Sequence, residues 1–417
     1  MSDKYLIINA GSSSLKFSLY SMPGELELVN GLIEKIGQVD SAYRLRFDNQ
    51  KDGNLEKINS HNEAVKVMLR ELLARGFVMS VDEIKGVGHR VLHGGEYYAD
   101  SVVIDEEVLN HIRELTKFGP LHHPGQIAGI EAMQQILSDV PQIAVFDTSF
   151  GQTMPKENYL YPVPYKWYTE HAVRKYGFHG TSHKYITHEM QRILGRDNIN
   201  IISCHIGSGA SISAIKDGVC IDTSMGLTPN AGLVMGTRCG DIDVSIIDNI
   251  CKEEQCSVED VMNALNTRSG LIGISSKSDY RDVEKLAIEG DENAQIALKM
   301  LRNSVLKYIS QYYLQLGGKV DAIVFTAGIG ENATLFRKGV MEGLEPLGIK
   351  LDEEANSHIA GFREYQSGDI STPDSRIRVV VLPTDEERMI LKDTYRLCME
   401  KGFQKKIGEK NESNGTK

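Results

Sequence analysis

The sequence predicts an α/β protein built from two copies of one domain. Segments with strand and helix periodicity follow the same order in both halves, strand–turn–strand–strand and then helix–strand–helix. In each half the first strand runs into a turn of small residues, at 9–14 and again at 205–210. Because clefts between domains are preferred ligand sites, this duplication predicts a ligand between the two copies.

Composition narrows the class of protein. The chain has 417 residues, enough for two or three domains, and its 41% apolar and 25% charged residues are ordinary for a globular protein. A net charge of −11 argues against nucleic-acid binding. The sequence has no apolar run of membrane-spanning length, no n-region and h-region of a signal peptide, and no CxxC spacing among its six cysteines. We therefore expect a cytoplasmic protein with reduced thiols that binds neither nucleic acid nor membranes.

In the first half, short alternating or continuous apolar runs predict strands, and apolar residues at helical spacing predict helices. Pro124 suits the first turn of a helix and marks the start of one. The expected strands are 4–9, 15–20, 28–36, 43–47, 86–92 and 142–146, and the expected helices are 61–75, 105–117 and 124–138.

The second half repeats the same kinds of pattern. A glycine-rich turn is expected at 327–332, and the polar, charged residues 401–417 predict a disordered tail. The expected strands are 200–205, 211–215, 219–223, 322–326 and 378–382, and the expected helices are 242–253, 257–266, 291–316 and 385–400.

The turn at 9–16 has the composition of an anion site. Gly11 and the serines after it leave backbone N–H groups and hydroxyls open, which suits a phosphate. Lys16 adds a positive charge, and Asn9 adds a neutral donor and acceptor. A tight hairpin with solvated serines is the alternative. The second small-residue turn, at 207–209, favours the phosphate interpretation.

The familiar nucleotide-binding motifs are absent from the sequence. Neither GxxxxGK[ST] nor the protein-kinase motifs occur. The glycine pairs at 207/209 and 328/330 lack the third glycine of a dinucleotide fingerprint, so a Rossmann assignment is weak.

Further motifs place charged or polar residues in apolar surroundings. Arg90 and Asp147 lie at strand ends, His179 and His183 lie four residues apart, and Arg238 lies near glycines. Arginine near glycine suits phosphoryl groups, because the backbone leaves the planar guanidinium accessible. For each arginine alone, a surface ion pair is the alternative. A zinc site of the HExxH type is excluded because position 180 is glycine.

Four motifs together resemble the acetate kinase family. They are Asn9-Ala10-Gly11-Ser12-Ser13-Ser14-Leu15-Lys16, Gly177-Phe178-His179-Gly180-Thr181-Ser182-His183, Gly236-Thr237-Arg238 and Phe325-Thr326-Ala327-Gly328-Ile329-Gly330-Glu331-Asn332. The resemblance runs from residue 4 to about 399, with the motifs in the family's order. The family belongs to the superfamily of acetate and sugar kinases, Hsp70 ATPase domains and actin.

This resemblance implies a fold and an activity. The fold is two duplicated actin-like, ribonuclease H-like domains with the active-site cleft between them. The first comprises 1–150 completed by the C-terminal helix 386–400, and the second, 151–385, serves nucleotide binding and dimerisation. The reaction is reversible phosphoryl transfer between ATP and acetate, giving ADP and acetyl phosphate, with Mg²⁺, for which Mn²⁺ can substitute. The family is usually a homodimer.

The resemblance also implies residue roles. Arg90 and Arg238 would clamp the carboxylate and the transferring phosphoryl group, and His179 would donate a hydrogen bond to that group. Asp147 would orient the acetate or a metal-bound water, and needs no strong basicity because acetate is ionised at pH 7. Glu386 would be the carboxylate on the metal side, although spacing does not distinguish it from Glu387.

The remaining implied residues fall into three groups. The metal group is Asn9 and Glu386, and the acetate group is Arg90, Leu92, Leu121, Phe178 and Pro229. The nucleotide group is Ser12, Lys16, His205, Gly207, Ser208, Gly209, Asp279, Tyr280, Arg281, Gly328, Ile329, Gly330 and Asn332.

Four positions depart from the usual pattern of the family. Ser208 stands where Asn is common, Tyr280 where Phe is usual, Asp385 where Asn is frequent, and Val244 where Pro is common. None of these removes a catalytic group. Two alternatives stay open: a kinase of propionate or another short-chain carboxylate, and an ATPase of the actin or Hsp70 kind.

Overall fold

The computed structural model describes residues 3–359 and 367–400. The tail expected to be disordered, 401–417, lies outside the described residues. The chain divides into two compact units, Met1–Ser149 with Asp385–Lys417 and Phe150–Thr384. Within 3–359 and 367–400, no helix is long and apolar enough to cross a membrane.

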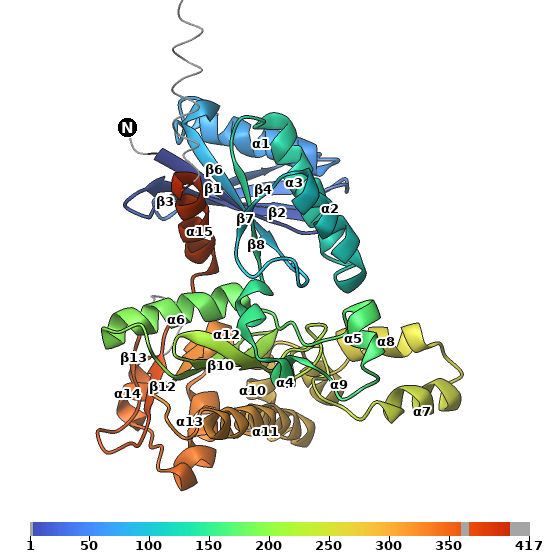
Figure 1. Ribbon diagram of the computed structural model, residues 1–417, viewed down its shortest axis with the longest axis vertical. Coiled ribbons are helices and arrows are strands. Elements are labelled where there is room, and N and C mark those ends of the chain that lie inside the picture. The colour runs from blue at the N-terminus through green and yellow to red at the C-terminus, as the bar shows by residue number, and fades with distance from the viewer. Residues whose placement is uncertain (1–2, 360–366, 401–417) are drawn as a thin grey trace, which may run out of the picture. The chain divides into compact units, whose positions relative to one another are not determined.

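The first unit is built on one mixed sheet (Figure 1). Its strands are β1 Asp3–Ala10, β2 Ser14–Met22, β3 Leu26–Glu34, β4 Ala42–Phe47, β5 Gln50–Leu55, β6 Ile84–Val91, β7 Val102–Val103 and β8 Gln142–Phe146. The strand order is β5-β4-β3-β2-β1-β6-β8-β7. Strands β1 to β5 form an antiparallel meander, whereas β6 runs parallel to β1 and β8 runs parallel to β6.

Helices cover both faces of this sheet. They are α1 His61–Ala74, α2 Glu106–Glu114, α3 His123–Ile136 and α15 Glu386–Glu400. Successive residues of β1 point to opposite faces. Leu6 and Ile8 therefore pack in one apolar cluster with α1 and α3. Tyr5 and Ile7 pack in another cluster with α15, so the C-terminal helix completes the core of this unit.

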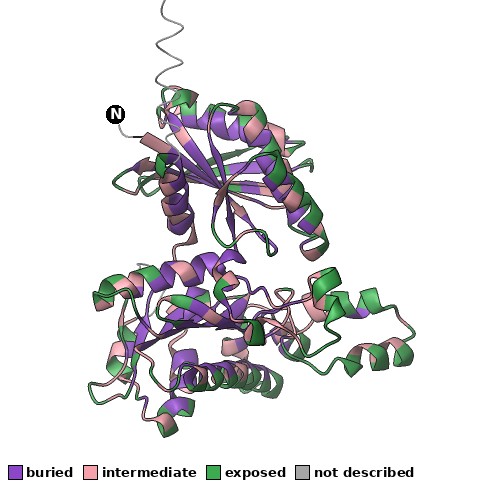
Figure 2. Ribbon diagram, viewed as in Figure 1, coloured by how far each residue is buried: buried purple, intermediate pink, exposed green. Residues whose placement is uncertain are grey.

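The second unit has its own mixed sheet, with strand order β11-β10-β9-β12-β14-β13. The strands are β9 Ile201–Ile206, β10 Ala210–Lys216, β11 Val219–Thr223, β12 Ala322–Thr326, β13 Gly368–Asp369 and β14 Arg378–Val381. The helices are α4 Lys156–Tyr159, α5 Lys166–His171, α6 Gly180–Leu194, α7 Ser245–Glu253, α8 Val258–Thr267, α9 Leu271–Ser275, α10 Tyr280–Ile288, α11 Glu292–Gln315, α12 Ala327–Asn332, α13 Thr334–Leu344 and α14 Glu353–His358. Figure 1 shows α6 on one face of the sheet and α11 and α13 on the other. Buried residues concentrate on the strands and on the helix faces turned toward them (Figure 2).

The two sheets share one topology. In the first unit, β3-β2-β1 are antiparallel and β1-β6-β8 are parallel. In the second, β11-β10-β9 are antiparallel and β9-β12-β14 are parallel, in the same spatial order. The prediction of a duplicated, actin-like α/β fold is therefore confirmed.

Where the structure differs from the expected elements, burial explains the difference. Strand β5 was not expected, because every one of its residues is exposed and it lacks the apolar alternation that signals a strand. Helix α6 was also not expected, although Tyr185, Ile186 and Met190 are buried at helical spacing beside polar residues such as Ser182 and His183. The short strands β7 and β13 and the helices α4, α5, α9, α10, α13 and α14 were also not expected. Helix α7 begins at Ser245, later than the expected 242.

The glycine-rich segment 327–332 is a short helix, α12, so the expectation of a turn was wrong. Glycine disfavours helix interiors by about 1 kcal/mol relative to alanine. Here the Glu331 carboxylate accepts hydrogen bonds from the backbone N–H groups of Ala327 (2.7 Å) and Thr384 (3.2 Å). These contacts fasten the start of the segment and tie it to Thr384, which offsets the low helix propensity.

The docking of α15 on β6 depends on a missing side chain at Gly88. A Cβ there would lie 2.2 Å from Thr394 Oγ1 and 2.8 Å from Ile390 Cγ2, both on α15. We expect Gly88→Val to lower the free energy of unfolding by about 1–3 kcal/mol, as overpacking does. Urea titration measures this. Gly24→Ala is the control, since apart from its chain neighbours no heavy atom of the described residues lies within 4 Å of that Cβ; an equal response of both variants would contradict the packing argument.

Candidate active site

In both units the candidate residues lie at the carboxyl ends of parallel strands. The pairing of β1 with β6 and of β6 with β8 brings Asn9, Arg90 and Asp147 to one edge of the first sheet. In the second unit His205 pairs with Thr326, just before the two glycine-rich segments. Open α/β sheets bind their ligands at this edge. Each unit therefore presents polar groups where ligands bind in such sheets.

Arg90 and Asp147 form a bidentate ion pair in the first unit. Arg90 Nε lies 3.1 Å from both carboxylate oxygens, and Nη2 lies 2.7 Å from Oδ2. Burial raises the pKa of Asp147 while the Arg90 guanidinium opposes that rise, and the charge of Glu386 adds to it. The pairing orients the guanidinium and leaves its remaining N–H groups to other acceptors.

The structure distinguishes the two adjacent glutamates of α15. Glu387 forms an ion pair with Lys16 and accepts a hydrogen bond from Ser18. Glu386 instead acts electrostatically on Arg90 and Asp147, raising the pKa of both. Of the two carboxylates, Glu386 is thus the one beside the candidate catalytic pair.

The turn between β1 and β2 is a tight hairpin with accessible hydroxyls. Gly11 N–H donates to Ser14 O (2.8 Å), and His61 Nε2 lies 2.8 Å from Gly11 O. A Cβ at Gly125, near the start of α3, would lie 2.4 Å from Gly11 O. His61 and the start of α3 thus contact the turn at Gly11 O, and Ser12 at its tip is exposed.

The oxygen ligands in the first unit suit Mg²⁺, provided that water and substrate complete its coordination shell. In the part of the chain that the structure describes, no group of three or more His, Cys, Asp or Glu side chains could hold a metal ion. Mg²⁺ takes one or two carboxylates and completes its shell with water and substrate phosphates. The amide oxygen of Asn9 and the carboxylate of Glu386 are hard ligands of that kind.

The four apolar residues expected to hold a methyl group are divided between the units. Leu92 is buried at the end of β6, and its N–H donates to Gln126 Oε1 (3.1 Å). Leu121 is 77% exposed and so contributes to no core. Phe178 is buried in the second unit, where Pro229 O accepts a hydrogen bond from Arg238. No unit by itself assembles all four.

His179 and Arg238 converge on Gly209 in the second unit. A Cβ at Gly209 would lie 3.5 Å from His179 Nε2 and 3.4 Å from Arg238 Nη1. His179 has φ 59°, and its Nδ1 lies 3.0 Å from Ser211 Oγ. The ring stacks on His205 with centroids 4.2 Å apart. Stacking and the Ser211 contact fix the ring so that Nε2 faces the turn at 207–209.

Two further histidines near His179, His205 and His183, form hydrogen bonds with serine hydroxyls. His205 Nδ1 lies 2.8 Å from Ser182 Oγ. Burial lowers the pKa of His183 well below its usual value, and its two nitrogens each lie 2.8 Å from a serine hydroxyl, Ser203 and Ser211. His183 is therefore a neutral residue that supports the site.

Arg238 is a largely buried cation without an acidic partner. Its Nη1 donates to Pro229 O (3.2 Å) and contacts Met235 Sδ (3.7 Å). Burial lowers the pKa of its guanidinium. Among the described residues, no carboxylate forms an ion pair with Arg238. A desolvated cation in this state gains most from an anionic ligand.

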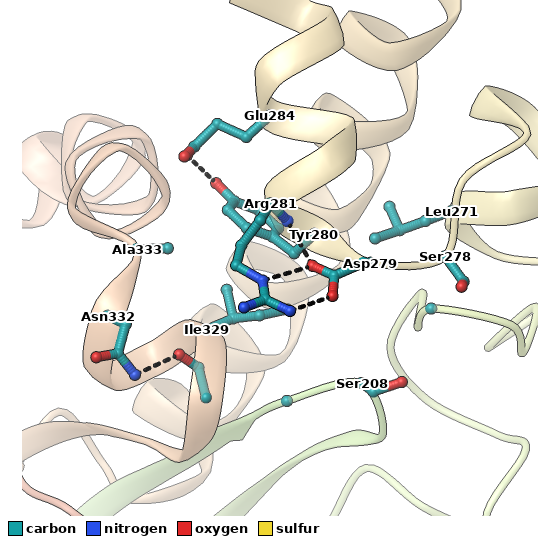
Figure 3. A pocket seen from close by; sticks show the side chains of 13 residues that line it. Ser208, Leu271, Ser278, Asp279, Tyr280, Arg281, Glu284, Ile329, Asn332 and Ala333 are labelled. Carbon is teal, nitrogen blue, oxygen red and sulfur yellow. Dashed lines mark hydrogen bonds and ion pairs between the residues drawn. The ribbon is translucent and has the colours of Figure 1, made fainter. Parts of the chain in front are cut away.

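Beside this group the second unit contains a pocket of about 340 Å³ (Figure 3). It brings together residues predicted to bind the nucleotide, namely Gly207, Ser208, Asp279, Tyr280, Arg281, Gly328, Ile329 and Asn332. Of the other predicted residues, His205 and Gly209 lie near its floor, Gly330 supports its wall, and Ser12 and Lys16 belong to the first unit.

Hydrogen bonds fix the polar side chains of this pocket. Asp279 accepts from Arg281 Nε (2.9 Å) and Nη2 (2.6 Å), which lowers the pKa of Asp279 to about 2. The Tyr280 hydroxyl donates to Glu284 Oε1 (2.7 Å). Figure 3 shows both pairs at the start of α10, whose N-cap is Asp279, with Ile329 and Asn332 of α12 across the pocket. The pocket is thus lined by Ile329 and Asn332 on one side and by oriented polar groups on the other.

A buried arginine supports the α12 wall. Arg337 is fully buried and donates to the carbonyl oxygens of Gly330 (2.9 Å), Glu331 (2.8 Å) and Ile359 (2.6 Å). Burial lowers the pKa of Arg337 to about 10. Carbonyls at the C-terminal end of α12 thus find donors, and the pocket wall is held in place.

Five residues that line the pocket were not predicted from the sequence. They are Gly236, Leu271, Ser278, Glu284 and Ala333. Gly236 stood in a quoted motif without an assigned role, and its N–H donates to Ser208 O (3.0 Å). Glu284 follows Tyr280 by four residues, a signal that becomes readable only once α10 is known to be a helix. Leu271, Ser278 and Ala333 carry no chemical signal.

Comparison with known proteins agrees with this arrangement. A family model of the Acetokinase family matches residues 4–392. An acetate kinase of an Exiguobacterium species is 48% identical over 399 residues, which cover 95% of this chain and 98% of the relative. The crystal structure of Porphyromonas gingivalis acetate kinase has a TM-score of 0.90 and 40% identity, covering 95% of this chain and 100% of that one. A propionate kinase from Francisella tularensis has a TM-score of 0.88, 40% identity and the same coverage.

His89, next to Arg90, predicts a pH dependence of stability. Burial lowers the pKa of His89 from 6.5 to about 4, and its Nε2 lies 2.7 Å from Gln142 Oε1. Between these two values the unfolded chain binds a proton that the native chain does not. The free energy of unfolding should therefore fall as the pH falls through this window, by on the order of 1 kcal/mol per pH unit.

Urea titrations at several pH values in that window measure the slope. His89→Gln removes the titrating group and should flatten the slope. An identical slope in both proteins would exclude His89 as its source.

Proposed function

The chain belongs to the acetokinase family, and we propose that it catalyses the reversible Mg²⁺-dependent transfer of a phosphoryl group from ATP to acetate, giving acetyl phosphate and ADP. The observation that carries the proposal is Arg238, which has no ion pair within residues 3–359 and 367–400 and converges with His179 on Gly209 beside a pocket of about 340 Å³. A desolvated cation next to a nucleoside-sized pocket suits a nucleoside triphosphate.

In the proposed reaction the pocket between α10 and α12 binds adenosine, and the turn at 207–209 directs the phosphates toward Arg238. An acetate oxygen attacks the γ-phosphorus while the bond to the bridging oxygen of ADP breaks. Arg238 and His179 Nε2 stabilise the charge on the equatorial phosphoryl oxygens. Acetate is already an anion at pH 7, so no residue has to remove a proton.

Arg90 binds the acetate carboxylate with the N–H groups that Asp147 leaves available. Asp147 orients Arg90 through its bidentate contact. Asn9 and Glu386 would hold Mg²⁺, which supplies positive charge to the phosphates when bound. Lys16, Ser12, His205 and the glycines at 328 and 330 complete the proposed contacts with the nucleotide.

The proposed compartment is the cytoplasm. All six cysteines are free thiols, and three of them are buried. Disulfides form and persist in oxidising compartments, so free thiols support a reducing one.

A short-chain acid larger than acetate is the second candidate substrate, because a propionate kinase is among the similar structures. One methylene in an apolar pocket is worth only about 1–3 kcal/mol of discrimination. The decisive measurement is kcat/KM for acetate, propionate and butyrate, with acyl phosphate trapped by hydroxylamine. Acetate should give the highest value. ATP hydrolysis that ignores carboxylate and yields no hydroxamate would instead favour an actin- or Hsp70-like ATPase.

Arg238→Ala should lower kcat by on the order of 10³-fold, as loss of a phosphoryl-stabilising arginine does. Arg281→Ala serves as the comparison, because Arg281 is exposed and already paired with Asp279; its effect should fall on the KM for ATP. A loss of kcat below about tenfold in Arg238→Ala would remove Arg238 from the transfer step.

We also propose that the protein is a homodimer formed through α7 and α8. Helix α7 buries none of its residues and α8 buries only Val261 (Figure 2). Val244, Ile246 and Val258 are exposed on this part of the second unit. Helices normally bury an apolar face, and a second copy would bury this one.

Light scattering after size exclusion tests the dimer. The unmodified protein should elute with twice the 46.4 kDa mass of the chain. Ile246→Asp should shift it toward the monomer, whereas Val39→Asp, at an exposed position of the first unit, should not. A monomeric unmodified protein would contradict the proposal.

A further inference from the structure

Arg238 belongs to a loop whose two ends are bonded to each other. Gly232 N–H donates to the Asp241 carboxylate (Oδ1, 2.9 Å), and Asp241 N–H donates back to Gly232 O (3.0 Å). Inside the loop, Met235 N–H donates to Arg238 O (3.2 Å). The segment 232–241, here called the Arg238 loop, is therefore closed at its ends and cross-linked in the middle.

Helix α11 holds the Arg238 loop at separate points. The second carboxylate oxygen of Asp241 accepts hydrogen bonds from Lys307 Nζ (2.8 Å) and from the Tyr308 hydroxyl (2.8 Å). Ser304 Oγ, one turn earlier on α11, accepts from Val234 N–H (3.2 Å). One carboxylate thus closes the loop with one oxygen and anchors it to a long packed helix with the other.

The loop has little room to absorb a shift of its ends. Gly240 has φ 72°, and a Cβ there would lie 2.5 Å from Leu233 O. Gly232 has φ 99°, and its Cβ would lie 2.6 Å from Ser224 O. Both ends of the loop lie close to backbone carbonyl oxygens and cannot move independently. We therefore expect a loss of the Asp241 bonds to displace the whole loop, including Arg238.

We infer that Asp241 is a positioning residue, which sets the place of the Arg238 guanidinium by closing the Arg238 loop and anchoring it to α11. The inference rests on the proposed function, since it requires that Arg238 acts on the phosphoryl group. Within the part of the chain that the structure describes, the Asp241 side chain bonds only to this scaffold, namely to Gly232, Lys307 and Tyr308. Burial and the neighbouring Asp241 carboxylate raise the pKa of Tyr308, which keeps its hydroxyl a donor.

Asp241→Ala should lower kcat by about 10²-fold, because a misplacement of about 1 Å from a change far from the chemistry costs that much. The KM for ATP should change much less than kcat, because Gly236 is the one residue of the Arg238 loop among those that line the pocket between α10 and α12. Asp241→Asn keeps an oxygen for Gly232 N–H but loses the charge opposite Lys307. Its kcat should lie between those of the unmodified protein and of Asp241→Ala, and its thermal melting shows whether it is folded.

Asp222→Asn is the matched control. Asp222 is a buried carboxylate that also accepts from α11, through Gln315 Nε2 (3.2 Å), and from Lys175 Nζ (2.6 Å). It makes no bond to the Arg238 loop among the described residues. Its substitution should lower thermal stability and leave kcat unchanged.

A double-mutant cycle with Arg238→Ala separates positioning from general destabilisation. If Asp241 acts through Arg238, then Asp241→Ala causes no further loss of kcat once Arg238 has been replaced. An equal loss in both backgrounds, or a loss in Asp222→Asn as large as in Asp241→Asn, would overturn the inference. A normal kcat in Arg238→Ala would overturn the proposed role of Arg238 itself, and the two failures are thus distinguishable.

Discussion

The parallel register of three strands in each sheet is the constraint on which the other features depend. Parallel strands end together, so polar residues that follow strands far apart in the chain meet at one edge. In the first unit this puts Arg90, on β6, beside Asp147, after β8, although 57 positions separate them. In the second it puts the turn after β9 beside the glycine-rich helix after β12. Duplication of the topology repeats this edge in both units.

Three arginines, the buried Arg337 and the partly buried Arg90 and Arg238, show how one side chain serves different purposes. Arg90 is matched by a carboxylate, Arg337 by backbone carbonyls, and Arg238 by a carbonyl and a thioether. Leaving a desolvated guanidinium without an anion costs stability unless its N–H groups find acceptors. Arg337 meets that requirement within the fold. Arg238 meets it only in part, and this unmet demand is what we interpret as affinity for the phosphoryl group.

Charged side chains hold α12 and the Arg238 loop in place. The Glu331 carboxylate fastens the start of α12, Arg337 fastens its end, and Asp241 closes the Arg238 loop. In each case a charged side chain forms hydrogen bonds with backbone atoms of a glycine-rich segment. Glycine permits the close approach of the backbone to a ligand but loses more entropy on folding. The charged contacts offset that loss and keep the segments in one conformation.

The amino-acid sequence by itself determined the duplicated α/β fold and most strands, because buried strands carry continuous or alternating apolar residues that a single sequence displays. The motifs around Asn9, His179 and Arg238 were also readable, and through resemblance they indicated the family. Only the tertiary structure decided which of two adjacent glutamates faces Arg90, that 327–332 is a helix, and that Glu284 and Gly236 line the pocket. It also revealed the bonds of Asp241 to α11. These features depend on contacts between residues distant in the chain, and such contacts leave no local periodicity from which they could be predicted.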